Sequence, residues 1–184
     1  MAVRTTMGGP NVLMHQGIGL DAFNDLSRQK ALHAFYECCN SVVLAGDLAA
    51  GRPYWSHDEL FRRADALLFA LSESSVDTIL QAYPHVGRRP RSTKSAAEQC
   101  SVWDPRPEVM GALDSAAQRY AARFGFSFVM FVGDTDAEGV LAAISDRLHH
   151  ETETERKVVR NELAKINRTR LDRMLGPEGG YHNW

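Results

Sequence analysis

With 184 residues, the chain is long enough for one ordinary domain and too short for two of comfortable size. Hydrophobic residues make up 44% of it, and the formal net charge of −2 gives no reason to expect a nucleic acid or an anionic membrane as partner. No apolar stretch reaches the length of a membrane span, and no secretory signal is recognisable. We therefore expect a cytoplasmic protein with a small-molecule ligand.

Cysteine and histidine spacing gives no metal or redox motif. The three cysteines are Cys38, Cys39 and Cys100, and neither a CxxC nor an HxxxH pattern occurs. Adjacent cysteines do not form a common disulfide, so we expect reduced, buried thiols and no metal.

The domain is expected to cover residues 19–175. Residues 1–18 are predicted to be a flexible leader, and the glycine-rich residues 176–184 a flexible tail.

Four helices are predicted in the first half of the domain. The first begins after Ser27, whose hydroxyl can cap it, and continues through Cys39. The second covers residues 41–50 and ends at the glycine and proline that follow. Residues 56–59 form a capping box that opens the third, and a short fourth contains residues 76–80.

An irregular segment separates these helices from the next. Residues 83–94 contain two prolines, a glycine, three arginines and a lysine, and are predicted to be a loop before a new helix at Ser95. A long helix is predicted from Pro107 to Phe124, closed by Gly125.

The remaining chain is predicted to contain a connector and two helices. Residues 126–132 are β-prone but have no second strand to pair with, so we interpret them as an extended, buried connector. Residues 135–138 form a capping box that opens a helix to His150, and residues 154–175 are the last helix. The expected fold is all-α, a single-domain helical bundle of about seven to nine helices.

The last helix carries a charged residue on its inward face. That face consists of apolar residues at helical spacing: Val159, Leu163, Ile166 and Met174. Arg170 falls within this stripe, and Arg168 lies near its edge. An arginine that faces a core must be paired or bind an anion. Spacing alone favours a structural ion pair or a snorkelling side chain over a ligand.

Two other segments carry polar groups suited to a small heterocycle. Glu98 and Gln99 can accept from and donate to a ureido or amide group, although a capping box begun by Ser95 is the simpler explanation. His85 can shuttle protons near neutral pH, although an ordinary exposed turn histidine is again simpler.

Taken in order, these segments resemble the OHCU decarboxylase family, which acts on 2-oxo-4-hydroxy-4-carboxy-5-ureidoimidazoline (OHCU) in the breakdown of urate to allantoin. The resemblance runs from about Gly19 to Leu175. It is carried by short motifs whose order and spacing together are specific: Phe23-Asn24 with Leu26-Ser27, Cys38-Cys39, Gly51-Arg52-Pro53-Tyr54, Asp65-Ala66, Tyr83-Pro84-His85-Val86-Gly87, Ser95 to Gln99, Arg123 to Val129 and Lys165 to Leu171.

The resemblance implies an all-helical enzyme that needs neither metal nor organic cofactor, and a homodimer, because the family is often dimeric. It also implies a set of site residues. The catalytic residues would be Tyr83, Glu98 and Arg170, and the substrate-binding residues Pro84, Ser95, Gln99, Phe126, Val129 and Arg168.

Two positions depart from the family pattern, and Tyr83 is the more important. Tyr83 stands where the family has the histidine of a His-Pro loop, and Ser127 stands where proline is usual. A tyrosine holds no proton equilibrium near pH 7 unless its pKa is strongly lowered. Our leading prediction is a cofactor-free decarboxylase, that is, a carbon–carbon lyase that acts on OHCU or on a related ureido-imidazoline or hydantoin-like heterocycle.

Two alternatives stay open. One is a paralogue recruited in specialised metabolism to a cyclisation, isomerisation or addition on a related nitrogen heterocycle. The other is a non-catalytic protein that binds a small molecule.

Overall fold

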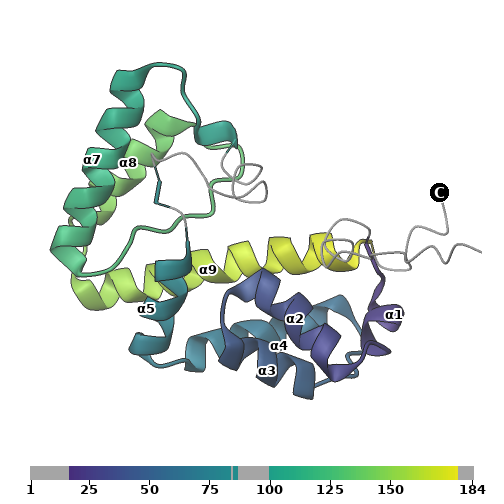
Figure 1. Ribbon diagram of the computed structural model, residues 1–184. Coiled ribbons are helices and arrows are strands. Elements are labelled where there is room, and N and C mark those ends of the chain that lie inside the picture. The colour runs from purple at the N-terminus through teal and green to yellow at the C-terminus, as the bar shows by residue number, and fades with distance from the viewer. Residues whose placement is uncertain (1–16, 84, 87–99, 178–184) are drawn as a thin grey trace, which may run out of the picture. The chain divides into compact units, whose positions relative to one another are not determined.

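The computed structural model describes residues 17–83, 85–86 and 100–177 (Figure 1). Within these residues the chain forms eight α-helices, one 3-10 helix and no strand, which confirms the predicted all-α class. The elements are α1 (Leu20–Asn24), α2 (Arg28–Cys39), α3 (Val42–Ala50), α4 (His57–Ala70), α5 (Glu73–Ala82), η1 (Cys100–Val102), α7 (Pro107–Phe124), α8 (Ala137–Arg147) and α9 (Thr152–Leu175). None of the described helices combines the length and apolar character that a membrane crossing requires.

The chain divides into two compact units. Unit 1 contains residues up to Leu68 together with those from Asn167 onward, and unit 2 runs from Phe69 to Ile166. Residues 1–16 and 178–184 lie outside the described residues, so the predicted leader and tail stay predictions. Within unit 1, the N–H groups of Ile18 and Gly19 donate to the carbonyls of Met174 and Leu175, at 3.1 and 2.7 Å.

Serine side chains cap helices α2 and α3, and the cap of α2 by Ser27 was predicted. The Ser27 hydroxyl accepts the N–H of Lys30 at 3.4 Å, and the Ser41 hydroxyl accepts that of Leu44 at 3.2 Å. Each hydroxyl satisfies one of the N–H groups that the first turn of a helix leaves without a partner. Both helices therefore start within a residue of the predicted position.

Two predicted capping boxes form only in part. At α4, the Ser56 hydroxyl accepts the N–H of Glu59 at 3.1 Å, but the Glu59 carboxylate accepts the N–H of Trp55 instead of that of Ser56. At α8 the cap is Asp136 rather than Thr135, because the Asp136 carboxylate accepts the Gly139 N–H at 2.8 Å. A carboxylate competes well for a helix N-terminus because its charge favours the positive end of the helix dipole.

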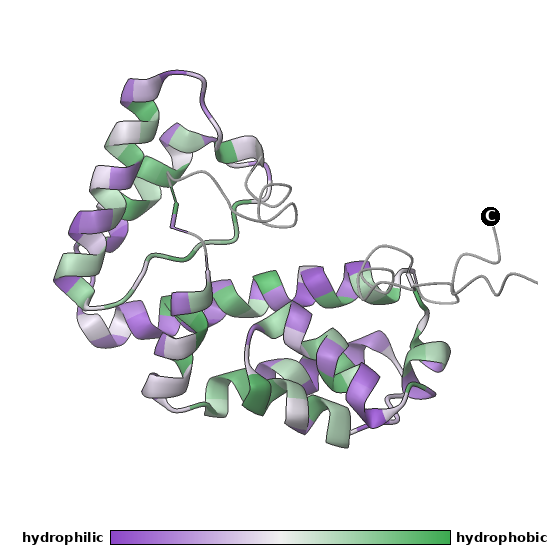
Figure 2. Cartoon of the chain, viewed as in Figure 1, coloured by the Kyte–Doolittle hydropathy of each residue, from purple (hydrophilic) through white to green (hydrophobic). Residues whose placement is uncertain are grey.

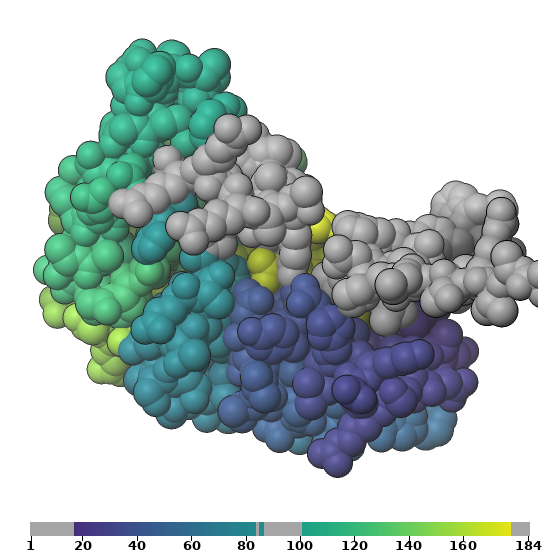
Figure 3. Space-filling view, in the orientation of Figure 1, coloured from purple at the N-terminus to yellow at the C-terminus, as the bar shows by residue number. Residues whose placement is uncertain are grey.

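The core of unit 1 surrounds the aromatic rings of Phe23 and Phe35, which meet edge to face at 4.9 Å. Arg52 holds the end of α1 in place, because its Nη1 donates to the carbonyls of Phe23, Asn24 and Leu26 at 2.8–3.0 Å. Figure 3 shows residues 17–68, coloured purple to blue-green, closely packed on the visible face. The family motif around Arg52 is therefore structural in this chain.

In unit 2, α7 and α8 pack side by side (Figure 1). Helix α7 begins at Pro107, as predicted, and ends at Gly125, whose φ of 79° is a left-handed value that glycine adopts without strain. The connector 126–132 follows outside any helix or strand, with Phe126, Phe128 and Val129 buried. The predicted connector without regular secondary structure is thus confirmed, but its burial only in part, because Phe131 is 37% exposed.

Helix α9 contributes to both units, and its pattern is the predicted one. Its buried residues include Val159, Leu163, Ile166, Arg170 and Met174, at 0–8% exposure. Figure 2 shows apolar green and polar purple residues alternating along it. The stripe that singled out Arg170 in the sequence is therefore a real inward face.

Candidate active site

Arg170 and Arg168 lie on the same helix but in different surroundings. Arg170 is 4% exposed, and its Nη1 donates to the carbonyl of Cys38 at 3.0 Å. Arg168 is exposed and forms an ion pair with Asp65, whose hydrogen bond raises the pKa of the guanidinium above its ordinary value. Charged groups in a low-dielectric interior act more strongly on a ligand than exposed ones do. Of the two arginines, Arg170 is the better placed to act on a small anionic molecule.

Asn167 lies one turn before Arg170 and has an unusual feature. Its side chain is 4% exposed, and among the described residues its Oδ1 is a buried side-chain atom with no hydrogen-bond partner. Residues three apart on a helix share a face. A buried polar atom without a partner costs free energy and calls for a specific explanation, such as a ligand. The sequence analysis missed Asn167, because a polar residue beside the apolar stripe is indistinguishable from one at its solvent edge.

The connector places two predicted site residues in unit 2. Phe126 is 5% exposed and packs against aromatic rings, with the Arg156 guanidinium 4.0 Å from its ring centroid. Val129 is 3% exposed, and its carbonyl accepts the Nη1 of Arg147 at 2.8 Å. These contacts occupy the Phe126 ring and the Val129 carbonyl, so any contact of this segment with a ligand has to involve other atoms.

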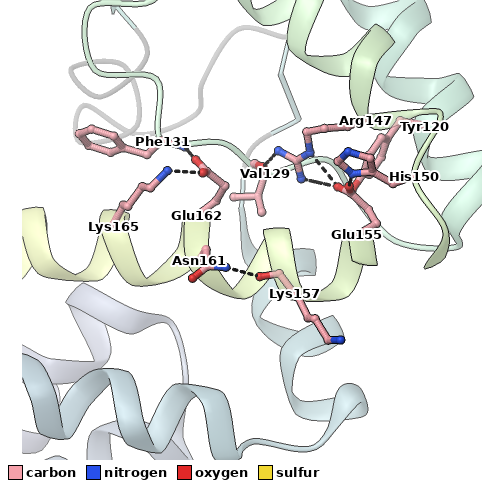
Figure 4. A network of polar contacts seen from close by, with 10 residues as sticks. All are labelled: Tyr120, Val129, Phe131, Arg147, His150, Glu155, Lys157, Asn161, Glu162 and Lys165. Atoms are coloured by element: carbon pink, nitrogen blue, oxygen red, sulfur yellow. Dashed lines mark hydrogen bonds and ion pairs between the residues drawn. The ribbon is translucent and has the colours of Figure 1, made fainter. Parts of the chain in front are cut away.

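Arg147 belongs to a buried cluster of charges that sequence reasoning did not find (Figure 4). Its Nε and Nη2 donate to Oε1 of Glu155, at 2.8 and 2.5 Å, and Glu155 is fully buried. The Tyr120 hydroxyl also donates to Glu155, and Nδ1 of His150 lies 2.7 Å from its other oxygen. Burial, followed by the hydrogen bond to Glu155, raises the pKa of Tyr120 far above its ordinary value, so the phenol stays a donor.

The end of α8 and the turn that follows it bring the members of this cluster together. The prediction of a helix to His150 is wrong, because α8 ends at Arg147. The N–H groups of His149 and His150 bond to carbonyls three residues back, at 3.1 Å, which closes a tight turn. That turn brings Glu155 of α9 against Arg147. The two residues are eight apart across a helix break, a spacing that carries no sequence signal.

Tyr83 is the C-cap of α5, in an extended conformation with φ −80° and ψ 142°, and its side chain is half-buried. His85, two residues on, is exposed. Four other predicted site residues lie outside the described residues, and their roles stay predictions: Pro84, Ser95, Glu98 and Gln99. The described part of the chain contains no group of three His, Cys, Asp or Glu side chains arranged to hold a metal ion.

Tyr83, Phe126 and Val129 belong to unit 2, and Arg168 and Arg170 to unit 1. Within unit 2, Phe126 and Val129 lie on the same connector segment. Within unit 1, Arg170 is buried whereas Arg168 is exposed.

Comparison with known proteins gives the same family as the sequence motifs. A profile of the OHCU decarboxylase family matches residues 24–172, most of the chain. The 2-oxo-4-hydroxy-4-carboxy-5-ureidoimidazoline decarboxylase of Haloferax volcanii is 28% identical over 172 residues, which cover 90% of this chain and 100% of that protein. The uric acid degradation bifunctional protein of Bacillus sp. is 26% identical over 162 residues, or 85% of this chain and 32% of that protein. The chain thus spans about a third of the bifunctional relative.

Two solved structures have a similar fold. A crystal structure of OHCU decarboxylase in the presence of (S)-allantoin superposes with a TM-score of 0.69 at 20% identity, covering 77% of this chain and 96% of that one. The crystal structure of (S)-allantoin synthase gives a TM-score of 0.68 at 17% identity, covering 86% of this chain and 54% of that one. At these identities the likeness supports the helical fold and nothing finer. The family profile, which matches residues 24–172, shows that the chain belongs to the OHCU decarboxylase family, a family of carboxy-lyases that need no cofactor.

Proposed function

We propose that this chain is a cofactor-free decarboxylase of OHCU or of a related ureido-imidazoline or hydantoin-like heterocycle. The observation that carries the proposal is the buried guanidinium of Arg170, whose Nη1 donates to the carbonyl of Cys38. A positive charge fixed in a low-dielectric surrounding stabilises an oxyanion more than one in water does, and needs no reorganisation during the reaction.

The proposed reaction breaks the bond between the ring carbon and its carboxylate. Carbon dioxide leaves, its electron pair forms a double bond to the neighbouring ring carbon, and the charge passes through the ring C=N nitrogen to the 2-oxo oxygen. We assign the stabilisation of that oxyanion to Arg170, and the holding of the ring to N–H groups of the connector around Val129. A proton then adds from one face to the neighbouring carbon, which bears the ureido group, and this sets the stereochemistry. The hydroxyl on the decarboxylated carbon loses its proton and becomes the carbonyl of the product.

The ureido arm of the substrate needs both donors and acceptors. We assign Glu98 and Gln99 to this arm, with Ser95 and Pro84 beside them, on the strength of the family motif. Asn167 adds a side-chain oxygen that lacks a partner within the described chain, and a ureido N–H would supply the missing donor. We assign the anion contact to Arg170 rather than Arg168, because Arg168 is exposed and already paired with Asp65.

Tyr83 supports a second candidate function. It replaces the histidine of the family's His-Pro loop, so proton transfer by an imidazole is unavailable at that position. A paralogue that catalyses a cyclisation, isomerisation or addition on a related nitrogen heterocycle would have no need of that imidazole. In the decarboxylase, Tyr83 would instead orient the substrate or donate a hydrogen bond.

Freshly generated OHCU is the direct test. We expect the wild-type protein to speed the loss of OHCU absorbance and to form optically active allantoin. We expect Tyr83→His, which restores the family residue, to raise kcat, and Glu98→Gln to lower kcat/KM by at least about 100-fold. If the protein binds OHCU without turning it over, the proposed decarboxylase is wrong and the protein is a non-catalytic binding protein. Turnover of a different heterocycle, with OHCU inert, would favour the paralogue.

We also propose a homodimer in the cytoplasm. Val42 and Val43 in the first turn of α3 are 65% and 57% exposed, and Trp55 is 84% exposed, an arrangement that a second copy would cover. The buried, unbridged thiols of Cys38 and Cys39 suit a reducing compartment. Light scattering of wild type and Val43→Lys tests the dimer, because a lysine at a covered position should shift the mass to that of one chain.

A further inference from the structure

The connector 126–132 is fastened by two charged side chains from the helices that follow it. Arg147 at the end of α8 donates to the carbonyl of Val129 at 2.8 Å, and Glu162 of α9 accepts the N–H of Phe131 at 2.7 Å. Both contacts lie within unit 2 and are drawn in Figure 4. Side chains thus anchor the peptide groups on both sides of Met130.

Neither anchor is left to move freely. The Arg147 guanidinium is held by Glu155 and stacks 4.5 Å from the ring centroid of Phe128. Glu162 is held by Lys165, whose Nζ lies 2.6 Å from its second oxygen. A side chain whose other contacts are fixed positions its partner with little loss of entropy on binding.

The two anchored atoms belong to the two peptide groups that flank Met130. In a trans peptide the carbonyl and the N–H point in opposite directions. The Met130 N–H therefore points away from Arg147, and the Met130 carbonyl points away from Glu162. The two anchors thus fix the orientation of one peptide N–H and one carbonyl.

We propose that Arg147 and Glu162 are positioning residues for substrate binding. They hold the connector so that the Met130 N–H and carbonyl meet the heterocycle at a set distance. This inference rests on the proposed function, in which connector N–H groups hold the substrate ring. Neither side chain touches the substrate, and each acts through the backbone it fastens.

Glu162 gives the sharper test, because it lies near the surface and its loss leaves the buried cluster intact. Glu162→Gln keeps an oxygen that can accept the Phe131 N–H, whereas Glu162→Leu removes it. We expect Glu162→Leu to raise KM for OHCU about tenfold with kcat nearly unchanged, since the connector would bind ground state and transition state alike. Glu162→Gln should stay within about twofold of wild type.

The second arm compares Arg147→Lys with the wild type. Lysine keeps the charge but cannot hold Glu155 and the Val129 carbonyl in one planar fork. We expect KM to rise at least as much as in Glu162→Leu. Lys157→Met is the matched control, because Lys157 is an exposed residue of α9 whose side chain pairs, within the described residues, with Glu153.

Amide exchange gives a readout independent of turnover. The Phe131 N–H should exchange faster in Glu162→Leu and at the wild-type rate in Lys157→Met. Faster exchange with an unchanged KM would overturn the positioning role and leave the proposed function standing. An unchanged exchange rate would show that Glu162 does not fasten the connector. Failure of the wild-type protein to turn over OHCU would overturn the proposed function and this inference together.

Discussion

Arg147 and Arg170 are both buried but differ in what surrounds them. Arg147 in unit 2 is surrounded by groups of the protein itself: a carboxylate, a phenol and a backbone carbonyl. Arg170 in unit 1 donates to a backbone carbonyl and shares its face with Asn167, whose buried oxygen has no partner among the described residues. A buried ion pair completed within the fold holds the structure together, whereas a buried acceptor with no partner among the described residues, as at Asn167, fits a ligand. Burial alone does not identify a binding residue, and the Asn167 oxygen on the face of Arg170 is what sets this part of α9 apart.

The largest expected effect tests the structural half of this comparison. Arg147→Met would leave Glu155 buried without its cation and the Val129 carbonyl without a donor. We expect a loss of about 3–5 kcal/mol in the free energy of unfolding, measured by urea denaturation. A variant that unfolds at the wild-type urea concentration would mean that the cluster contributes little to stability.

Arg170 should show the opposite balance. Arg170→Lys keeps the charge but loses the planar donor fork, and we expect kcat/KM for OHCU to fall by about 100-fold. The urea midpoint should move much less than in Arg147→Met. Equal losses of stability in the two variants, with turnover of the Arg170 variant preserved, would remove the distinction between the two arginines.

Asn167→Leu separates folding from binding at a single position. Replacing a buried unpartnered oxygen by an apolar group of similar size should raise the free energy of unfolding by about 1 kcal/mol. The same change removes the proposed acceptor for the ureido group, so KM should rise about five- to tenfold. Thermal denaturation and steady-state kinetics on one preparation measure both. A variant that is less stable, with KM unaltered, would assign Asn167 to the core.

Arg168→Gln should have the smallest effect. Its exposed ion pair with Asp65 is worth less than about 1 kcal/mol, and we assign it no contact with the reacting atoms. Turnover is expected within about twofold of wild type. A loss as large as that of Arg170→Lys would restore Arg168 as the substrate-binding arginine.

Local rules in the sequence were enough to predict most of the helices. Pro107 and Gly125 bound α7 because proline fits a first turn and glycine accepts a left-handed cap. Ser27 and Ser41 mark helix starts because a serine hydroxyl can accept an N–H group of the first turn. The five-residue helix α1 was not predicted, because it is too short to show a period.

The site was only partly predictable. Arg170 followed from the period of α9, because an inward arginine breaks an otherwise apolar stripe. The Arg147 cluster did not, because its members come from α7, α8, α9 and the turn between them and meet only in three dimensions. Asn167 required the hydrogen-bond partners of each buried atom to be known, which no sequence pattern supplies. Tyr83 was recognised as a departure only through the family motif.

The hydrogen bonds from Ile18 and Gly19 to Met174 and Leu175 join distant parts of the chain at the end of α9. Carbonyls in the last turn of a helix ordinarily face solvent, and such ends fray. In this protein the Met174 and Leu175 carbonyls accept the N–H groups of Ile18 and Gly19, from the start of the domain sequence. These two amide protons can exchange only when the segment around residue 18 separates from the end of α9. Their exchange rate therefore reports how often unit 1 opens, and hydrogen exchange measures it with no label attached to the protein.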